Sequence, residues 1–282
     1  MQHIFTVDVE DWYHGFPPSF GLGIVSQKRL NKGMNILLDT LDEFKVKATF
    51  FWLASHAREY PTLLKDTFDR GHEIGCHGND HIPIYEMSPA RFSSDIHSAL
   101  EILSQHIGNP ISCFRAPYFS LRSDTLWAVE ILIEHEILFD SSILPIRHWR
   151  TGIPDAKDEI HIIETQSGSL IEVPITTTSV AGKKLPTAGG GYFRAYPYWL
   201  TDRNISESEI SGKPAVFYIH PWELDKDQPR INGHSIPKFM HYLGIEATYQ
   251  KLRKLLHYHE FGPLMQIASS HMPTTIKEPV VC

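Results

Sequence analysis

Four short motifs in this chain carry residue types that could act together in a hydrolysis reaction. They are residues 8–11 (Asp-Val-Glu-Asp), residues 77–81 (His-Gly-Asn-Asp-His), residues 115–118 (Arg-Ala-Pro-Tyr) and His220. A mononuclear metal hydrolase needs groups that hold a metal, a base that takes a proton from water and an acid that protonates the leaving group. Together the four motifs offer all three.

The histidine pair is the first candidate for metal binding. With 17 histidines in 282 residues, about one pair at a spacing of four is expected by chance. Two solvated or capping histidines are therefore the simpler interpretation of the spacing alone. However, His77 and His81 follow a strand-like run, and Gly78 between them permits a sharp exit from that strand. Imidazoles at this spacing can face one metal ion.

Three carboxylates, Asp8, Glu10 and Asp11, follow an apolar N-terminal run. A polar turn after a strand is the ordinary interpretation. A buried strand end, though, rarely carries this much negative charge without a counter-ion, and a divalent cation would supply one. Two histidines and one carboxylate form a metal site with open positions. A second carboxylate could then be the general base.

The two remaining motifs supply further candidates. Arg115 is either a structural ion-pair partner or a residue that fixes a catalytic carboxylate by charge-assisted hydrogen bonds. Pro117 stiffens the segment that follows, and the backbone N–H of Tyr118 could stabilise an oxyanion. His220 alone is more often a satisfied core or surface residue, but beside the other motifs it becomes a candidate general acid.

The elements that must position these residues alternate along the chain. Strand-like runs are expected at residues 4–9, 48–53, 73–76, 112–116, 137–140, 170–175 and 215–220. Helical patterns are expected at residues 31–44, 61–70, 89–107, 123–135 and 246–257. This order predicts an α/β fold with a parallel sheet or barrel. The candidate residues lie at the C-terminal ends of strands, where such folds build their sites.

Composition limits the class of protein. A length of 282 residues with 42% hydrophobic content fits one large domain. A net charge of −7 with no basic stripe argues against nucleic-acid binding. Three cysteines without a Cys-x-x-Cys motif suit a reducing compartment. No secretion signal or membrane-spanning run is evident, so a cytoplasmic location is expected.

Residues 152–203 have a less regular pattern than the rest. Three glycines at 189–191 precede an aromatic cluster that includes Tyr192 and also Arg194. An ordinary loop and a substrate-binding wall are both compatible with this composition, because glycines permit close approach of a ligand and aromatic rings offer flat faces to sugars. Tyr192 and Arg194, together with Trp12 and Pro117 beside the reactive motifs, are the candidates for substrate contact.

Taken together, the motifs resemble those of the polysaccharide deacetylases with a NodB homology domain, carbohydrate esterase family 4, and in particular a subgroup from bacterial exopolysaccharide gene clusters. Residues 6–12 stand where the family has Thr-Phe-Asp-Asp-Gly, and residues 77–81 match its histidine motif except at Gly78. Residues 115–118 match its Arg-x-Pro-Tyr, and residues 218–220 stand where it has Leu-x-His. The resemblance covers nearly the whole chain, as one domain over residues 1–282.

The resemblance implies a distorted (β/α)7 barrel that removes N-acetyl groups from amino sugars of a bacterial polysaccharide or its precursor. It implies one divalent metal, expected to be Zn²⁺, held by His77, His81 and a carboxylate, with Asp8 as base and His220 as acid. Because the family's adjacent Asp-Asp is here Asp-Val-Glu-Asp, either Glu10 or Asp11 would be the third ligand. An amidohydrolase acting on a small amide such as allantoin and an inactive glycan-binding barrel are the alternatives. Oligomeric state is left open.

Overall fold

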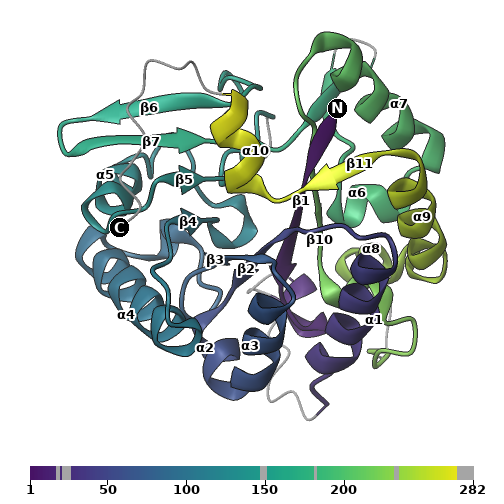
Figure 1. Cartoon of the computed structure of the whole chain (residues 1–282), viewed down its shortest axis with the longest axis horizontal. Coiled ribbons are helices and arrows are strands. Elements are labelled where there is room, and N and C mark those ends of the chain that lie inside the picture. Colours follow the sequence, from purple (N-terminus) through teal and green to yellow (C-terminus); the bar gives the residue numbers. More distant parts are fainter. Residues whose placement is uncertain (17–19, 21–26, 147–150, 181–182, 232–234, 272–282) are drawn as a thin grey trace.

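The computed structural model describes residues 1–16, 20, 27–146, 151–180, 183–231 and 235–271, and its centre is a curled, mostly parallel sheet (Figure 1). In this part of the chain nine strands join in the order β10-β1-β2-β3-β4-β5-β7-β6, with β11 pairing β1. The strands are β1 (Gln2–Val9), β2 (Thr49–Trp52), β3 (Glu73–Cys76), β4 (Cys113–Phe114), β5 (Phe139–Asp140), β6 (His161–Thr165), β7 (Gly168–Glu172), β10 (Val216–Ile219) and β11 (Glu260–Gly262). A separate antiparallel pair joins β8 (Thr177–Val180) to β9 (Lys183–Pro186).

Helices lie around the outside of the curl (Figure 1). They are α1 (Leu30–Glu43), α2 (Ala54–Glu59), α3 (Pro61–Asp69), α4 (Pro89–Ile107), α5 (Trp127–Glu134), α6 (Gly190–Ala195), α7 (Tyr198–Ser211), α8 (Ile236–Tyr242), α9 (Ile245–Tyr258) and α10 (Leu264–His271). The long α4 begins where the sequence predicts it: the Ser88 side chain accepts a hydrogen bond from Arg91 N–H, and Pro89 is its first residue. The predicted α/β architecture, a distorted barrel in one domain, is confirmed.

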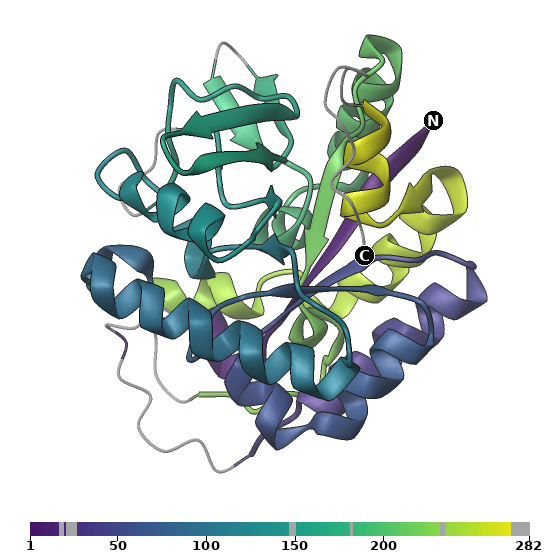
Figure 2. The same cartoon turned by 60° about the vertical axis from the view of Figure 1, so that its left-hand side comes forward.

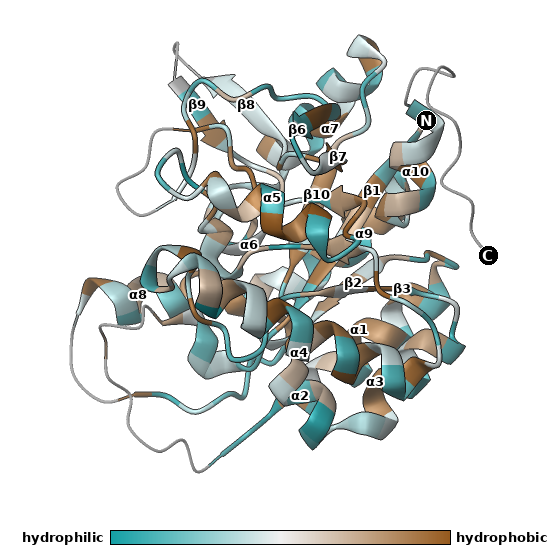
Figure 3. Ribbon diagram, turned by 90° about the vertical axis from the view of Figure 1, so that its left-hand side faces the viewer, coloured by the Kyte–Doolittle hydropathy of each residue, from teal (hydrophilic) through white to brown (hydrophobic). Residues whose placement is uncertain are grey.

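Each strand presents alternate residues to two different cores. On β1, Phe5, Val7 and Val9 pack outward against the helices, whereas Ile4 joins the cluster inside the curl. Thr6 and Asp8 share the face of Ile4, because side chains alternate along a strand. The inner face is thus apolar near the start of β1 and polar near its end. In Figure 3 the helices that cover the outer face, such as α1, α3 and α4, alternate hydrophobic and hydrophilic residues along their length.

Residues 152–203 are more regular than the sequence predicts. Their described part contains four strands, β6 to β9, the helix α6 and the start of α7; residues 181–182 lie outside the described residues. Figure 2 shows these strands grouped at one end of the molecule, with the light-green arrow of β10 pointing away from that end. The two hairpins therefore lie away from the edge at which β1 and β10 end. The hairpin pairings connect residues that are near in sequence, but they carry no simple alternation that would have revealed them.

No helix among the described residues is long and apolar enough to cross a membrane. Cys76 and Cys113 are buried free thiols, and Cys282 lies outside the described residues.

Candidate functional site

The inner face of the sheet positions a buried carboxylate against a buried arginine. Arg115, which follows β4, is 0% exposed, and its Nη1 donates to Asp8 Oδ1 and to Thr6 Oγ1, each at 2.8 Å. Its Nε donates to the Ser141 carbonyl (2.9 Å) and its Nη2 to Ser141 Oγ (2.7 Å). Asp8 is only 2% exposed. The expected pairing of Arg115 with a carboxylate at the end of the first strand is therefore present in the structure.

Next to Asp8, three side chains converge on a point. Glu10 Oε1 lies 2.8 Å from His81 Nε2 and 3.3 Å from His77 Nε2, and the three atoms all lie within 4.8 Å of one another. His77 Nδ1 lies 2.7 Å from the Arg115 carbonyl oxygen. Because a carbonyl oxygen only accepts, Nδ1 carries the proton and the lone pair of Nε2 faces Glu10. That tautomer is the one a metal-binding histidine needs, so the residues fit a divalent metal.

The turn that carries both histidines depends on unusual backbone conformations. Gly78 has φ +81°, a region that glycine adopts without steric cost. His81 has φ +56°, which is uncommon for a residue with a side chain. Tyr118, whose ring centroid lies 4.3 Å from that of His81, also has φ +56°. Such strain persists where the surroundings enforce it and clusters at functional sites.

Asp11 does not face the histidines. It is the N-cap of a short 3-10 helix, Trp12–Gly15, and its Oδ1 accepts from Trp12 N–H at 2.8 Å. Its Oδ2 accepts from the N–H groups of Arg29 (2.7 Å) and Leu30 (3.2 Å). Of the two carboxylates that the sequence leaves open, Glu10 is therefore the one near His77 and His81. Asp11 instead ties the N-terminal motif to the start of α1.

Trp12 is also structural. It is 6% exposed, its Nε1 donates to the Gln27 carbonyl, and it packs with Phe16 and Trp222. The sequence places it as a substrate contact, but burial in a core cluster removes its ring from the surface. Pro117 is likewise buried, at the start of the 3-10 helix Pro117–Phe119.

His220 contacts Glu223, which in turn forms a buried ion pair with Arg194. Glu223 Oε2 accepts from His220 N–H (2.9 Å) and lies 3.0 Å from His220 Nδ1, while Glu223 Oε1 accepts from Arg194 Nε at 2.6 Å. His220 Nε2 then points to the site, 3.9 Å from Asp8 Oδ2 and 3.7 Å from Glu10 Oε1. A carboxylate on Nδ1 fixes the tautomer and orientation of the ring.

Arg194 thus has a different role from the one the sequence predicts. It is 5% exposed and its guanidinium meets Glu223 together with the carbonyl oxygens of His241 and Leu243. It positions His220 and does not line a substrate wall. The reason is the fold of the glycine-rich segment, which forms α6 against β10. Tyr192 is half-buried on the same helix, with its ring 6.0 Å from that of Tyr196.

The electrostatics separate the roles of these groups. Burial disfavours the charged form of Glu10, but the neighbouring His81 and His220 outweigh it and hold the pKa of the Glu10 carboxyl well below its ordinary value. Burial would lower the pKa of His220, but Glu10 and Glu223 outweigh it and raise that pKa to about 9. Glu10 is therefore an anion, and His220 is a cation that can donate a proton at neutral pH.

Three residues of the site were missed by sequence reasoning. Glu223 is one, although an acidic residue three positions after a helix N-cap is a recognisable capping pattern. The others are His14 and His56, whose rings lie 5.1 Å apart, with His14 4.9 Å from His81. Burial lowers the pKa of His56 to about 4 and that of His14 well below its ordinary value. Both are neutral and add no positive charge to the site.

Comparison with known proteins was made on sequence and on structure. Residues 28–132 match the family model described as polysaccharide deacetylase, and residues 141–269 match a domain of unknown function, DUF3473. A peptidoglycan-N-acetylglucosamine deacetylase of Bacillus cereus is 33% identical over 95 residues, which are 33% of this chain. The chain spans about a third of that relative's own length (34%). Residues 28–132 of this chain therefore form a polysaccharide deacetylase domain.

Solved structures agree on the fold. A chain from Mycobacterium smegmatis, classed as a polysaccharide deacetylase, has a TM-score of 0.61 at 17% identity and covers 99% of this chain and 96% of its own. Puue allantoinase also has a TM-score of 0.61, at 13% identity, covering 94% of this chain and 88% of its own. Because both share the barrel to the same degree, the fold alone does not select between their reactions.

Behind the arginine of this deacetylase domain lies a second pair of buried carboxyl groups. Asp140 and Glu172 are register partners in β5 and β7, and both are 0% exposed. One oxygen of each has a partner: Asp140 Oδ1 accepts from Ser142 Oγ, and Glu172 Oε1 accepts from Ile143 N–H. Burial and the charge of Asp140 raise the pKa of Glu172 well above its ordinary value. Folding therefore favours the protonated form of Glu172.

This proton makes stability depend on pH. A carboxyl whose folded-state pKa is raised stabilises the fold below its unfolded pKa, roughly 4.3 for Glu. That stability is lost as the pH rises towards the folded-state value, by about 1.4 kcal/mol per pH unit for one proton. Glu172→Gln keeps a donor toward Asp140 and an acceptor for Ile143 without the ionisation. We expect its melting temperature to exceed that of the wild type at about pH 8, with a smaller difference at about pH 5. The exposed Glu86→Gln is the control, and equal pH dependence in all three proteins would contradict the assignment.

Proposed function

We propose that this chain is a metal-dependent hydrolase that removes N-acetyl groups from amino sugars of a bacterial polysaccharide or its precursor. One observation carries the proposal: ligand atoms of Glu10, His77 and His81 lie within 4.8 Å of one another, and His220 Nε2 lies 3.7 Å from Glu10 Oε1 and 3.9 Å from Asp8 Oδ2. The match of residues 28–132 to the polysaccharide deacetylase model and the similarity to a peptidoglycan-N-acetylglucosamine deacetylase support the substrate class. An amide hydrolase needs a base and an acid near one activated carbonyl, and Asp8 and His220 are the residues we propose for these roles.

Glu10, His77 and His81 would hold the metal ion. Two neutral imidazoles and one carboxylate form the set found in catalytic zinc sites, which leave a position open for water or substrate. When bound, Zn²⁺ would polarise the acetamide carbonyl and lower the pKa of a nearby water. Zinc is the proposed ion because this donor set, with nitrogen and a single carboxylate, suits it better than Mg²⁺ or Ca²⁺.

Asp8 and His220 would move the protons. Asp8 would accept a proton from the attacking water. Arg115 Nη1 donates hydrogen bonds to Asp8 Oδ1 and to Thr6 Oγ1, and these bonds fix the direction of the other carboxylate oxygen, Oδ2. His220 would give its Nε2 proton to the departing amine, since Glu223 holds the Nδ1 side. The Tyr118 backbone N–H is proposed to stabilise the oxyanion that forms on the acetyl carbonyl.

The function is tested by measuring acetate released from N-acetylglucosamine di- to hexasaccharides and peptidoglycan fragments, with Zn²⁺ or other divalent ions added, and by offering allantoin in parallel. We expect metal-dependent acetate release, and a loss of roughly 10²–10⁴-fold in Asp8→Asn with the metal retained. Turnover of allantoin without acetate release would select the small-amide reaction. Binding of glycans with no turnover at any metal would select the inactive barrel.

Substitutions of the two carboxylates Glu10 and Asp11 should have different effects on Zn²⁺ binding. Glu10→Gln should weaken Zn²⁺ binding at least tenfold, measured by titration calorimetry, because it removes an anionic donor. Asp11→Asn should bind Zn²⁺ like the wild type but melt at a lower temperature, because both Asp11 oxygens accept backbone N–H groups and the amide nitrogen of Asn cannot. Normal Zn²⁺ affinity in Glu10→Gln would show that the third ligand lies elsewhere.

Glu223 should set the alkaline limit of activity. Its carboxylate raises the pKa of His220, so Glu223→Gln should lower that pKa and move the alkaline limb of the kcat/KM profile to lower pH. The acidic limb, which belongs to the base, should stay in place. Circular dichroism and Zn²⁺ content check that the variant is folded and loaded. An unmoved alkaline limb in a folded, loaded variant would remove His220 from the role of acid.

A further inference from the structure

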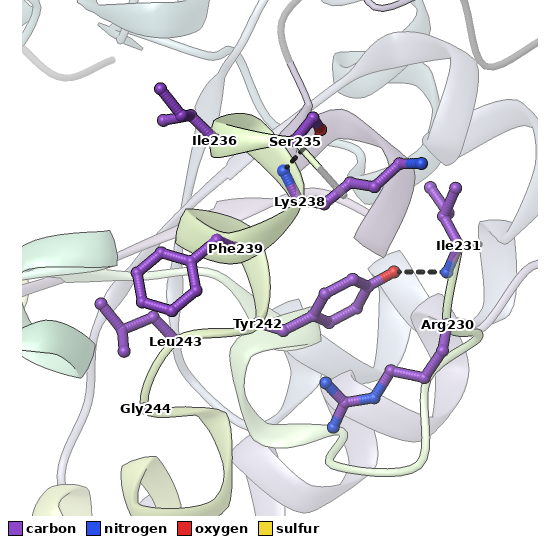
Figure 4. Close-up of a pocket in the computed structure, with 9 residues that line it drawn as sticks. All are labelled: Arg230, Ile231, Ser235, Ile236, Lys238, Phe239, Tyr242, Leu243 and Gly244. Carbon is purple, nitrogen blue, oxygen red and sulfur yellow. Dashed lines mark hydrogen bonds between the residues drawn. The ribbon is translucent and has the colours of Figure 1, made fainter. Parts of the chain in front are cut away.

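A pocket outside the catalytic cluster lies beside α8. It has a volume of about 790 Å³ and is lined by Arg230, Ile231, Ser235, Ile236, Lys238, Phe239, Tyr242, Leu243 and Gly244 (Figure 4). Apolar and aromatic side chains make up most of the lining, with Arg230, Lys238 and Ser235 as the polar groups. No residue of the proposed reaction is among them.

The helix beside this pocket exposes apolar side chains that a folded protein usually covers. Ile236 is 80% exposed, Phe239 65% and Met240 48%. Three large exposed apolar residues within five positions of one short helix form a patch, and such patches mark ligand or partner sites more often than isolated exposed residues do.

The pocket wall is held in place before any ligand arrives. The Tyr242 hydroxyl accepts from Ile231 N–H at 3.1 Å (Figure 4). It also donates to the Pro229 carbonyl (2.9 Å), so residues 229–231 are tied to α8. The Arg230 guanidinium lies over the Tyr242 ring, 4.5 Å from its centroid. Preformed walls are typical of binding pockets, because they reduce the entropy lost on binding.

A continuous series of ring contacts leads from this pocket to the proposed acid. Tyr242 meets the ring of His241 edge-on with centroids 4.7 Å apart, and His241 stacks on Trp222 at 4.4 Å. Trp222 in turn stacks on His220 at 5.6 Å. The pocket is therefore three ring contacts from the group that would protonate the leaving amine.

Arg194 forms hydrogen bonds both with Glu223, which contacts His220, and with the end of α8 beside the pocket. The same guanidinium that donates to Glu223 behind His220 also donates through Nη1 to the carbonyls of Met240, His241 and Leu243 at the end of α8. All these groups are buried or partly buried, so the position of α8 relative to His220 is fixed by one side chain.

We propose that the α8 pocket binds sugar units of the glycan chain that lie beyond the unit being deacetylated. This proposal rests on the proposed function and extends it by assigning a place on the fold, beside α8, to neighbouring units of the polysaccharide. Sugar rings have one apolar C–H face, which the exposed Phe239 ring and the aliphatic lining can cover. Arg230, Lys238 and Ser235 are placed to meet hydroxyl or acetamide groups at its edge.

The test compares kinetics across substrate length. Wild-type enzyme loaded with Zn²⁺ should have a kcat/KM that rises from di- to hexasaccharide. The double variant Ile236→Ser/Phe239→Ser should lose that rise, with KM for the hexasaccharide about tenfold higher, kcat nearly unchanged, and the disaccharide unaffected.

A matched control exists on α7: Trp199→Ser/Ile210→Ser removes one aromatic and one aliphatic side chain that are 60% and 88% exposed. Figures 1 and 3 both show α7 at a different level of the molecule from α8. The control should behave like the wild type.

A second measurement is independent of catalysis. Hexasaccharide binding to the same proteins is followed by titration calorimetry without turnover, using Asp8→Asn as the background. Weaker binding in the α8 variant alone supports the pocket. Equal binding in all variants, or a loss at every chain length, overturns it. If the α8 variant instead loses only binding to anionic lipid vesicles, the patch is a membrane-facing surface and the glycan proposal is wrong. Absence of acetate release from any substrate would count against the proposed function, while the binding comparison would still decide the pocket.

Discussion

The buried guanidinium of Arg115 is the constraint on which the catalytic edge depends. A cation with no exposed surface must be surrounded by acceptors, because leaving it uncompensated costs about 3–5 kcal/mol. Its acceptors come from β1, through Thr6 and Asp8, and from the segment after β5, through Ser141. The ring of Phe51 on β2 covers it at 4.3 Å. The arginine therefore fixes the relative positions of several strands, and the same contacts fix the direction of Asp8.

Two buried ion pairs lie at the candidate site. Arg115 pairs with Asp8, the proposed base, and Arg194 pairs with Glu223, which contacts His220, so each of these two carboxylates has its own buried cation. In front of them, Asp8 and Glu10 face the same space, with the charge of His220 as their near partner. With Arg115 paired to Asp8 and Arg194 paired to Glu223, the charge of His220 balances that of Glu10, so three cations match three carboxylates. The case for a metal between Glu10, His77 and His81 therefore rests on the convergence of their ligand atoms.

Most strands of the central sheet, even the short β3, β4 and β5, could be predicted from the sequence, whereas short helices such as α2 and α8 and the longer α7 could not. The periodicity of residues 89–107 and the cap at Ser88 suffice to define α4, but α2 and α8 have six and seven residues and form because of what they pack against. Within the site, the residue types and strand ends indicate Asp8, Arg115 and His220. The choice between Glu10 and Asp11 needs the structure, since it depends on Asp11 accepting backbone N–H groups from α1, eighteen and nineteen residues along the chain.

The glycine-rich segment shows how one composition can serve different physical purposes. A Cβ on Gly189 would lie 2.2 Å from the Tyr218 carbonyl oxygen, so the glycine is there because two backbones touch. That contact brings α6 onto β10 and Arg194 to Glu223, within the region matched by the domain of unknown function. His77, His81 and Arg115 lie within the region matched by the deacetylase model, and Asp8 and Glu10 precede both. The site is thus assembled from three parts of the chain. The C-terminal region contains His220, Glu223, Arg194 and the α8 pocket, so under the proposed function differences in that region would change substrate choice while the proposed metal ligands are retained.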